Sequence, residues 1–487
     1  MQAERSAQAV WPLAIVALAL ISLGTPLCWL SGYGLATQYE DDAFYYFQIA
    51  KNVAHGRGFT FDGLHETNGF HPLWLALLVP LFRVLPGLDL PVRAAGLLET
   101  LLLGCAGALV YAVMRRSAPR YTALLSGVLV YALPGTRNHT RVGLETALCM
   151  CLLAALWHAG VQLAERTTRA RLLGAGTLCA LATLARLEAL CALAVLCWLL
   201  RSQLRAADVL WLVAPPLATL AAYVSWNQLQ FGTLLPVSGM AKQLWAGAEL
   251  RGIPGLYFSP LAWVLLCAAA ALALGRWLGP RVPWLSRLYF PLCSALAMLG
   301  LDFASLGHLE RWYLGVLVLA AAPTLASALS ASRRASLLAL AAVVGLALWR
   351  VPYTVRSIDV AQYQAELRGE AADWLRAHLP PNTRVGAWNG GMFGYYSGQH
   401  IIMLDGLANS PEFYRRALRD GDLLGYLRDE RVDHLVTLNC NFDPVLWTAR
   451  SVDHERYLSR SYERRGPVSD RQLKDPCNDA FQLWVRK

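Results

Sequence analysis

The chain has 487 residues, of which 56% are hydrophobic and only 16% are charged, and its mean hydropathy is +0.38. Soluble globular proteins carry about 25% charged residues, so this composition excludes an ordinary soluble protein and favours a polytopic membrane protein. The net charge of +10 comes largely from short arginine clusters between apolar runs, a pattern typical of cytoplasmic loops, and we therefore expect no nucleic-acid partner.

The first apolar run, residues 11–30, is long enough to cross a hydrocarbon core of about 30 Å as a helix. We expect it to stay attached as a span, because residues 25–28 fit neither a signal-peptide cleavage site nor a lipoprotein box. The hydropathy predicts about eleven spans. They cover residues 11–30, 92–113, 121–134, 144–163, 171–185, 189–200, 208–226, 258–275, 288–304, 312–330 and 335–349.

The arginine clusters predict the topology, because arginine-rich short loops stay in the cytoplasm. The clusters are Arg115, Arg116 and Arg120; Arg166, Arg169 and Arg171; Arg201 and Arg205; Arg276, Arg281 and Arg287; and Arg333 and Arg334. With all of them cytoplasmic, the C-terminus faces outside. Residues 71–85 are apolar but short and contain Pro72, Pro80 and Arg83, which predicts a helix in the outer interface. If that helix were a span, the topology after it would be inverted.

The first outer loop, residues 31–91, carries the most informative motif, Glu40-Asp41-Asp42. Two adjacent aspartates allow one carboxylate to accept a proton from an attacking hydroxyl while the other orients the first or holds a cation. The alternative is that Asp41 and Asp42 cap the helix predicted from Ala43 to Val53.

Other ionisable residues occur in the remaining outer loops and span ends, and together they predict one polar cavity at the outer face. They are His71, Arg137, His139, Arg141, Glu145, Arg186, Glu188, Lys242, His308, Glu310 and Arg311. Alternatives remain for single groups. Arg186 with Glu188, or residues 308–311, can be interfacial ion pairs, Lys242 can be a snorkelling lysine, and His308 can be structural.

Residues 350–487 differ in composition from the preceding part of the chain, because they contain no long apolar runs and many more charged residues. Short strand-like segments alternate with amphipathic stretches in this region, which predicts a small α/β domain. It has helices near 363–379, 411–419 and 423–430, and strands near 384–388, 400–404, 433–438 and 480–485. The run 389–391 can bind an anion or form a tight turn. Cys440 and Cys477 lie in this domain, and we expect them to form a disulfide if the domain is periplasmic.

Several motifs together resemble a known superfamily. They are the runs 41–44, 56–60 and 70–74, followed by 143–146, 185–188, 231–239 with Lys242, 311–313 and 404–409. With about eleven spans and a long first outer loop, the chain resembles the GT-C superfamily of integral-membrane glycosyltransferases. The motifs are similar to those of bacterial members near the protein-mannosyltransferase-like and cell-wall arabinofuranosyltransferase-like enzymes.

The resemblance implies a transmembrane catalytic domain, residues 1–349, and a periplasmic α/β domain, residues 350–487, in the bacterial inner membrane. It implies an inverting transfer of a sugar from a polyprenyl-phosphate carrier to a glycan, lipid or protein acceptor on the outer face. The alternatives are a non-catalytic transporter or binding protein for lipid-linked sugars, and a structural membrane scaffold.

The resemblance and the chemistry of the residues assign expected roles. Asp41 would act as general base, assisted by Asp42. A divalent cation, Mg²⁺ or Mn²⁺, would be held by Asp42 and Glu145, and we expect no other cofactor. The donor phosphate would be bound by a set of cationic groups, Lys242, Arg186, Arg311 and His308. The acceptor or the sugar would contact a second set, His71, Glu188 and Asn68.

Overall fold

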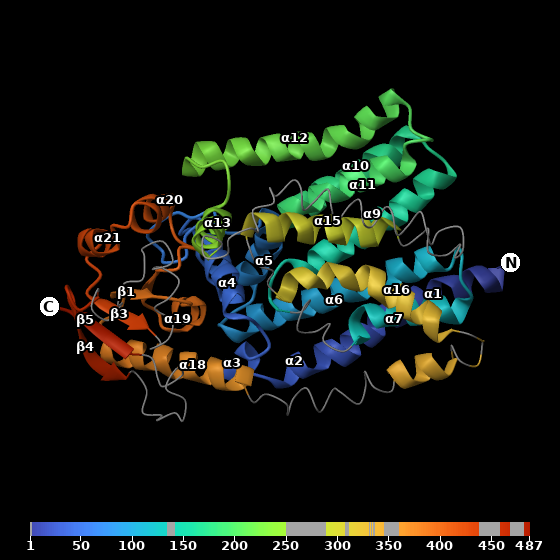
Figure 1. Ribbon diagram of the computed structural model, residues 1–487. Helices are drawn as coiled ribbons and strands as arrows, with labels where there is room; N and C mark the ends of the chain where they lie inside the picture. The colour runs from blue at the N-terminus through green and yellow to red at the C-terminus, as the bar shows by residue number, and fades with distance from the viewer. Residues whose placement is uncertain are drawn as a thin grey trace.

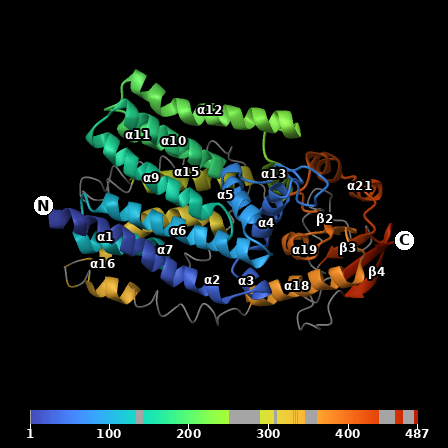
Figure 2. The ribbon, with the colours of Figure 1, turned by 180° about the vertical axis from the view of Figure 1, so that it is seen from behind.

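The computed structural model describes residues 2–133, 142–249, 289–306, 311–330, 332, 334, 337–344, 360–437, 458–467 and 482–487. A long bundle of helices carries a small C-terminal α/β domain at one end, and the N-terminus lies at the other end (Figures 1 and 2). The predicted fold class, a helical polytopic protein with a C-terminal α/β domain, is confirmed.

The bundle contains most of the helices. They are α1 (Gln2–Ala19), a π-helical turn (Leu20–Gly24), α2 (Thr25–Trp29), α6 (Asp89–Met114), α7 (Arg120–Ala132), α9 (Thr146–Glu165), α10 (Arg169–Ala185), α11 (Cys191–Leu200), α12 (Ala206–Phe231), α15 (Tyr289–Leu306) and α16 (Val318–Leu329). Among the described residues, five segments are long and apolar enough to cross a membrane. They are Val10–Trp29, Asp89–Met114, Thr146–Glu165, Ala206–Phe231 and Trp312–Leu329.

These five segments coincide with five of the expected spans. The expected spans 121–134, 171–185, 189–200 and 288–304 are also helices in the structure, although α7 has only 13 residues and α10 has 17. The span expected at 258–275 lies outside the described residues, and 335–349 is described only in part.

Small residues let neighbouring bundle helices approach closely, as is common where lipid surrounds the protein. A Cβ atom on Gly107 of α6 would lie 2.5 Å from the carbonyl oxygen of Gly127 in α7. A Cβ atom on Gly176 of α10 would lie 2.5 Å from the carbonyl oxygen of Leu212 in α12. Larger side chains at Gly107 or Gly176 would therefore force the helix pairs apart.

Three arginine-rich connections that the structure describes, 115–120, 166–169 and 201–205, lie at the end of the bundle that carries the N-terminus (Figures 1 and 2). Arg120 stacks over Trp11 of α1, with 4.4 Å from the guanidinium carbon to the ring centroid. Arg116 forms an ion pair with Glu165 at the end of α9. The connection from α11 to α12, residues 201–205, lies at the same end (Figures 1 and 2). The basic end and the C-terminal domain are thus at opposite ends of the bundle.

Between the bundle and the C-terminal domain lie four shorter helices (Figure 1), α3 (Gly32–Ala36), α4 (Asp41–Ala54), α5 (Pro72–Val84) and α13 (Val237–Glu249). Helix α5 is the segment expected in the outer interface, and its 13 residues extend about 20 Å, too short to cross a membrane alone. Helix α4 begins at the aspartate pair, and its aromatic residues are buried between the two parts of the molecule.

The C-terminal domain consists of α18 (Val360–His378), β1 (Arg384–Ala387), α19 (Gly391–Tyr396), β2 (His400–Met403), α20 (Pro411–Phe413), a π-helical turn (Tyr414–Arg419), α21 (Leu423–Asp429), β3 (His434–Thr437), β4 (Tyr462–Pro467) and β5 (Gln482–Arg486). The sheet order is β2-β1-β3-β5-β4. Strands β2, β1 and β3 are parallel, whereas β5 is antiparallel to both β3 and β4.

The expected strands and helices of this domain are found close to their predicted places, and strand β4 is an addition. The expected domain boundary at residues 349 and 350 and the expected disulfide between Cys440 and Cys477 lie outside the described residues.

Candidate functional site

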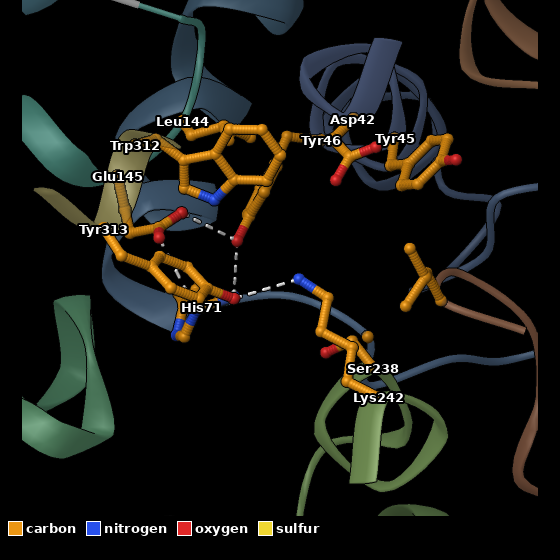
Figure 3. A pocket seen from close by; sticks show the side chains of 12 residues that line it. Asp42, Tyr45, Tyr46, His71, Leu144, Glu145, Ser238, Lys242, Trp312 and Tyr313 are labelled. Atoms are coloured by element: carbon orange, nitrogen blue, oxygen red, sulfur yellow. Dashed lines mark hydrogen bonds and ion pairs between the residues drawn. The ribbon is translucent and has the colours of Figure 1, made fainter. Parts of the chain in front are cut away.

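A pocket lies at the end of the bundle that faces the C-terminal domain, and several separate parts of the chain line it. The lining residues are Asp42, Tyr45, Tyr46, Gly69, His71, Leu144, Glu145, Ser238, Lys242, Trp312, Tyr313 and Leu407. The cavity is small, about 60 Å³. Figure 3 shows Asp42 on α4 and Lys242 on α13 directed into the same space from different helices.

Lys242 provides the positive charge of the pocket. Its Nζ donates a hydrogen bond to Tyr313 Oη at 3.1 Å, and it lies 5.9 Å from the ring centroid of Trp312 and 5.5 Å from that of Tyr313. Ser238, one turn earlier on α13, adds a hydroxyl to the lining. An ammonium group among aromatic faces and hydroxyls is suited to hold an anion such as a phosphate.

Glu145 provides a carboxylate on another side of the pocket (Figure 3). Tyr46 Oη donates to Glu145 Oε2 at 3.1 Å and accepts a hydrogen bond from the backbone N–H of His71 at 3.1 Å. His71 Nε2 lies 3.6 Å from Glu145 Oε1. This network connects α4 and the segment before α5 to the segment before α9, and it fixes the direction of the carboxylate.

Contacts of Gly143 with α4, α5 and α6 fix the segment that leads into α9. Gly143 has φ +84°, and a Cβ atom there would lie 2.3 Å from the Cβ of Ala43, so only glycine fits. Its N–H donates to Glu99 Oε1 at 2.9 Å, and its carbonyl accepts from Trp74 Nε1 at 3.1 Å. These contacts place Glu145 at the pocket.

The adjacent carboxylates Asp41 and Asp42 lie in different surroundings. Asp42 lines the pocket, whereas Asp41 is directed at the C-terminal domain. Asp41 Oδ2 accepts from the N–H of Gly391 at 2.9 Å, and Oδ1 accepts from the N–H of Met392 at 3.0 Å. Burial raises the pKa of Asp41, against the opposing effects of Arg368 and of these two N–H groups. The run 389–391, for which an anion site or a tight turn was expected, therefore binds an anion of the protein itself.

Arg186 and Glu188 lie behind the pocket, in a buried ion cluster. Arg186 pairs with Glu188 and also with Asp302, whose Oδ2 lies 3.2 Å from its Nη2. The guanidinium carbon lies 4.3 Å from the ring centroid of Tyr313, a ring that Lys242 also approaches. Arg186 therefore reaches the pocket through the ring of Tyr313 and is not among the lining residues.

Asn68 occupies an anchoring position outside the pocket lining. It is fully buried, and its side-chain amide donates to Asn227, Thr233 and the carbonyl of Leu235. Its Oδ1 accepts from the N–H of Val237 at the start of α13. The side chain thus joins the segment before α5 to α13, the helix that carries Lys242.

Other predicted site residues are not described. His308, Arg137, His139 and Arg141 lie outside the described residues, as does the side chain of Arg311. The structure therefore brings together Asp42, His71, Glu145 and Lys242 from the predicted set.

Sequence reasoning did not assign site roles to Tyr46, Asp302 or Glu99. Tyr46 had a signal of its own, because a tyrosine one helical turn after Asp42 lies on the same side of α4. Asp302 also had a signal, because an aspartate inside an apolar run usually forms an ion pair with another buried residue.

A divalent cation fits this site poorly as it stands. Among the described residues there is no group of three or more His, Cys, Asp or Glu side chains that could hold a metal ion. The carboxylate of Glu145 is also engaged by Tyr46 and faces His71. A metal bound here would need additional ligands from a substrate.

Comparisons with known proteins agree with the fold. Residues 355–475 match a family described as a domain of unknown function, DUF8728. A comparison with curated proteins finds no match to the sequence. Among solved structures, ArnT from Cupriavidus metallidurans bound to undecaprenyl phosphate is similar with a TM-score of 0.59 and 12% identity, over 98% of each chain.

A second similar structure is the oligosaccharyltransferase of Archaeoglobus fulgidus in complex with Zn and sulfate. The TM-score is 0.51 and the identity 13%, over 94% of this chain and 72% of that chain. Both neighbours are members of the superfamily that the sequence motifs resemble. The chain therefore has the fold of the GT-C integral-membrane glycosyltransferases.

Proposed function

We propose that this protein is a glycosyltransferase that moves a sugar from a polyprenyl-phosphate carrier to an acceptor at the outer face of the membrane. The observation that carries the proposal is the shared pocket of Asp42 and Lys242, a carboxylate and an ammonium group on different helices that face one cavity (Figure 3). A base and a phosphate-binding cation are the two groups that this transfer needs.

Lys242 binds the donor phosphate in this proposal. As the bond between the anomeric carbon and the phosphate oxygen breaks, that oxygen takes the electron pair and gains negative charge. An ammonium group placed at this oxygen stabilises the charge, and removing such a group typically costs about 10²–10³ in rate. Arg186 supports the same region from behind Tyr313.

Asp42 acts as general base in this proposal, whereas the sequence led us to expect Asp41 in that role. The reason for the change is that Asp42 lines the cavity, while both carboxylate oxygens of Asp41 accept backbone N–H groups of the C-terminal domain. The acceptor hydroxyl attacks the anomeric carbon on the face opposite the phosphate, so the configuration inverts, and its proton moves to the Asp42 carboxylate. Glu145, with Tyr46 and His71, holds sugar or acceptor hydroxyls through hydrogen bonds. Asp41, adjacent to the base, has both carboxylate oxygens at the C-terminal domain and acts on the site through its position.

The structural neighbours support the choice of donor. The similar ArnT structure contains bound undecaprenyl phosphate, and 98% of that chain is matched by this one. The other neighbour is an oligosaccharyltransferase in complex with Zn and sulfate. A cation here would be held by Asp42 and Glu145 together with oxygens of the donor phosphate. Activity that disappears with a chelator and returns with Mg²⁺ or Mn²⁺ would demonstrate this requirement.

We also propose that the pocket and the C-terminal domain face the periplasm. The support is the position of the basic connections at the opposite end of the bundle, since arginine-rich loops stay in the cytoplasm. Alkaline phosphatase fused after Lys487 should be active, and the same fusion at Arg201 should be inactive. The reverse result would contradict the orientation.

Donor turnover tests the proposed function. The purified full-length protein in lipid nanodiscs is supplied with a panel of synthetic polyprenyl-phosphate-linked sugars and an envelope extract as the source of acceptors. We expect release of polyprenyl phosphate from one member of the panel, together with a glycosylated product. Binding without release, with a denatured sample as control, would instead indicate a non-catalytic binding protein or transporter.

A further inference from the structure

The C-terminal domain contributes directly to the pocket, through the loop at residues 405–407. Leu407 lines the cavity, and its carbonyl oxygen lies 2.0 Å from the place where a Cβ atom would stand on Gly69, another lining residue. The backbone of this loop and that of the first outer loop therefore touch at the edge of the pocket. What holds the two backbones together decides the shape of the site.

Two carboxylates hold the turn at residues 389–392, which packs against α4. Asp41 accepts the N–H groups of Gly391 and Met392 at 2.9 Å and 3.0 Å. Asp405 Oδ2 accepts the N–H of Asn389 at 3.2 Å. A carboxylate that accepts two backbone N–H bonds is firmly placed, because such charge-assisted bonds are about twice as strong as neutral ones.

Asp405 connects this turn to the pocket. Its Oδ1 accepts the N–H of Leu407 at 2.8 Å, and its Oδ2 accepts the hydroxyl of Tyr45 at 3.1 Å. Tyr45 lies one turn after Asp41 on α4 and lines the pocket itself. The contacts thus run from Asp41 through the turn and Asp405 to Leu407, and back to α4 through Tyr45.

The close approach at Gly391 shows how tightly the two parts fit. A Cβ atom on Gly391 would lie 2.2 Å from the carbonyl oxygen of Asp41. Arg368, on α18, adds its Nε at 3.5 Å from Asp41 Oδ1. Both backbone and charge contacts of Asp41 are therefore directed away from the cavity.

We propose that Asp41 is a positioning residue, which fixes the C-terminal domain as a wall of the pocket and so sets the space beside Leu407 in which the acceptor must fit. Successive residues of a helix point about 100° apart, which allows Asp41 to hold the domain while Asp42 faces the substrates. This role rests on the proposed function, in which Asp42 is the base and the pocket takes the acceptor.

The test compares Asp41→Asn, Asp41→Ala and Asp42→Asn in the full-length protein. Asparagine keeps one of the two accepting oxygens of Asp41 and turns its NH2 group toward the other backbone N–H. Asp41→Asn should therefore keep kcat within about fivefold of the wild type, and should raise the acceptor KM and the exchange at residues 389–396 less than Asp41→Ala does. Asp41→Ala should raise KM for the acceptor about tenfold and speed hydrogen exchange at residues 389–396, because two N–H groups lose their partner. Asp42→Asn should lose about 10²–10⁴ in kcat with exchange at 389–396 unchanged.

Two results would overturn the positioning role. One is a loss of more than about 100-fold in kcat for Asp41→Asn with normal exchange at 389–396, which is the behaviour of a general base. The other is unchanged exchange in Asp41→Ala. The exchange measurement needs no activity, so it judges the role of Asp41 even if the protein transfers no sugar and the proposed function fails.

Discussion

Two neighbouring regions at the end of the bundle that carries the C-terminal domain use carboxylates in opposite ways. In the pocket, Asp42 and Glu145 face a cavity that also contains Lys242. In the contact with the C-terminal domain, Asp41 and Asp405 accept backbone N–H groups of the 389–392 turn. The partners of an acidic residue, and not its place in an acidic motif, therefore decide whether it is available to a substrate.

The strongest effect is expected in the pocket. Lys242→Met keeps the apolar stem and removes the charge, so kcat should fall about 10²–10³, as for other groups that stabilise a developing anion. Steady-state turnover of the synthetic donor measures this. Arg201→Met, which removes an exposed cation at the opposite end of the bundle, is the control and should keep full activity. A loss below about fivefold at Lys242 would remove it from the phosphate site.

The second prediction concerns the contact between Gly69 and Leu407, where the pocket meets the C-terminal domain. In Gly69→Ala the new Cβ would lie 2.0 Å from the carbonyl oxygen of Leu407, so the loops must separate. We expect a loss of about 1–3 kcal/mol in the free energy of unfolding, as for other overpacked sites, together with weaker acceptor binding. Thermal unfolding and acceptor KM report the two effects.

Gly239→Ala is the matched control for Gly69→Ala. Gly239 lies on α13 next to the lining residue Ser238, and a Cβ atom there would meet nothing within 4 Å. Equal effects of the two substitutions would show that the contact between Gly69 and Leu407 has no special importance.

The third prediction uses the titration of Asp405. Burial raises the pKa of Asp405 to about 6, whereas an unfolded aspartate titrates near pH 3.9. Between about pH 4 and pH 6 the folded state therefore holds a proton that the unfolded state has released, so this group makes stability fall as the pH rises through that window. Above about pH 6 its contribution stays constant.

Asp405→Asn removes this titration and keeps one of the two oxygens that accept hydrogen bonds. The stability difference between the variant and the wild type should therefore depend on pH below about 6 and become constant above it. Thermal unfolding of both proteins from about pH 4.5 to about pH 7.5 measures that difference. A difference that does not change with pH would mean that Asp405 has an ordinary pKa in the folded protein.

The weakest effect is expected for Tyr45→Phe, which removes only the hydroxyl that donates to Asp405 Oδ2. A hydrogen bond to a charged group contributes about 1.5–3 kcal/mol, and Asp405 keeps the N–H groups of Asn389 and Leu407, so the loss should lie at the lower end. Chemical denaturation is the measurement. Unchanged stability would show that the contact between α4 and Asp405 does not help to hold the domain.

Much of the architecture could be predicted from the sequence, because long apolar runs and arginine-rich connections are local patterns. The segments at 10–29, 89–114, 146–165 and 206–231 follow directly from hydropathy. Strand β4, Tyr462–Pro467, could not be predicted in this way. Its residues are mostly charged or polar, and it is a strand because β5 pairs with it at the edge of the sheet.

The site could be predicted only in part. The sequence marks Asp42, Glu145 and Lys242 as candidates, because ionisable groups at membrane depth are costly and usually pair with each other or line a site. The partner of Asp41 could not be found in this way, since Gly391 lies 350 positions away along the chain and contributes only its backbone N–H. Every non-proline residue carries such a donor, so the sequence contains no signal that distinguishes this one.

A structure determined by electron microscopy in nanodiscs, with polyprenyl phosphate bound, would show the roles of both aspartates at once. We predict density for the phosphate in the pocket beside Lys242 Nζ, with Asp42 across the cavity and Asp41 still bonded to Gly391 and Met392. Phosphate density away from Lys242, or Asp41 turned from the C-terminal domain toward the phosphate, would contradict the assignment of the pocket and of its two carboxylates.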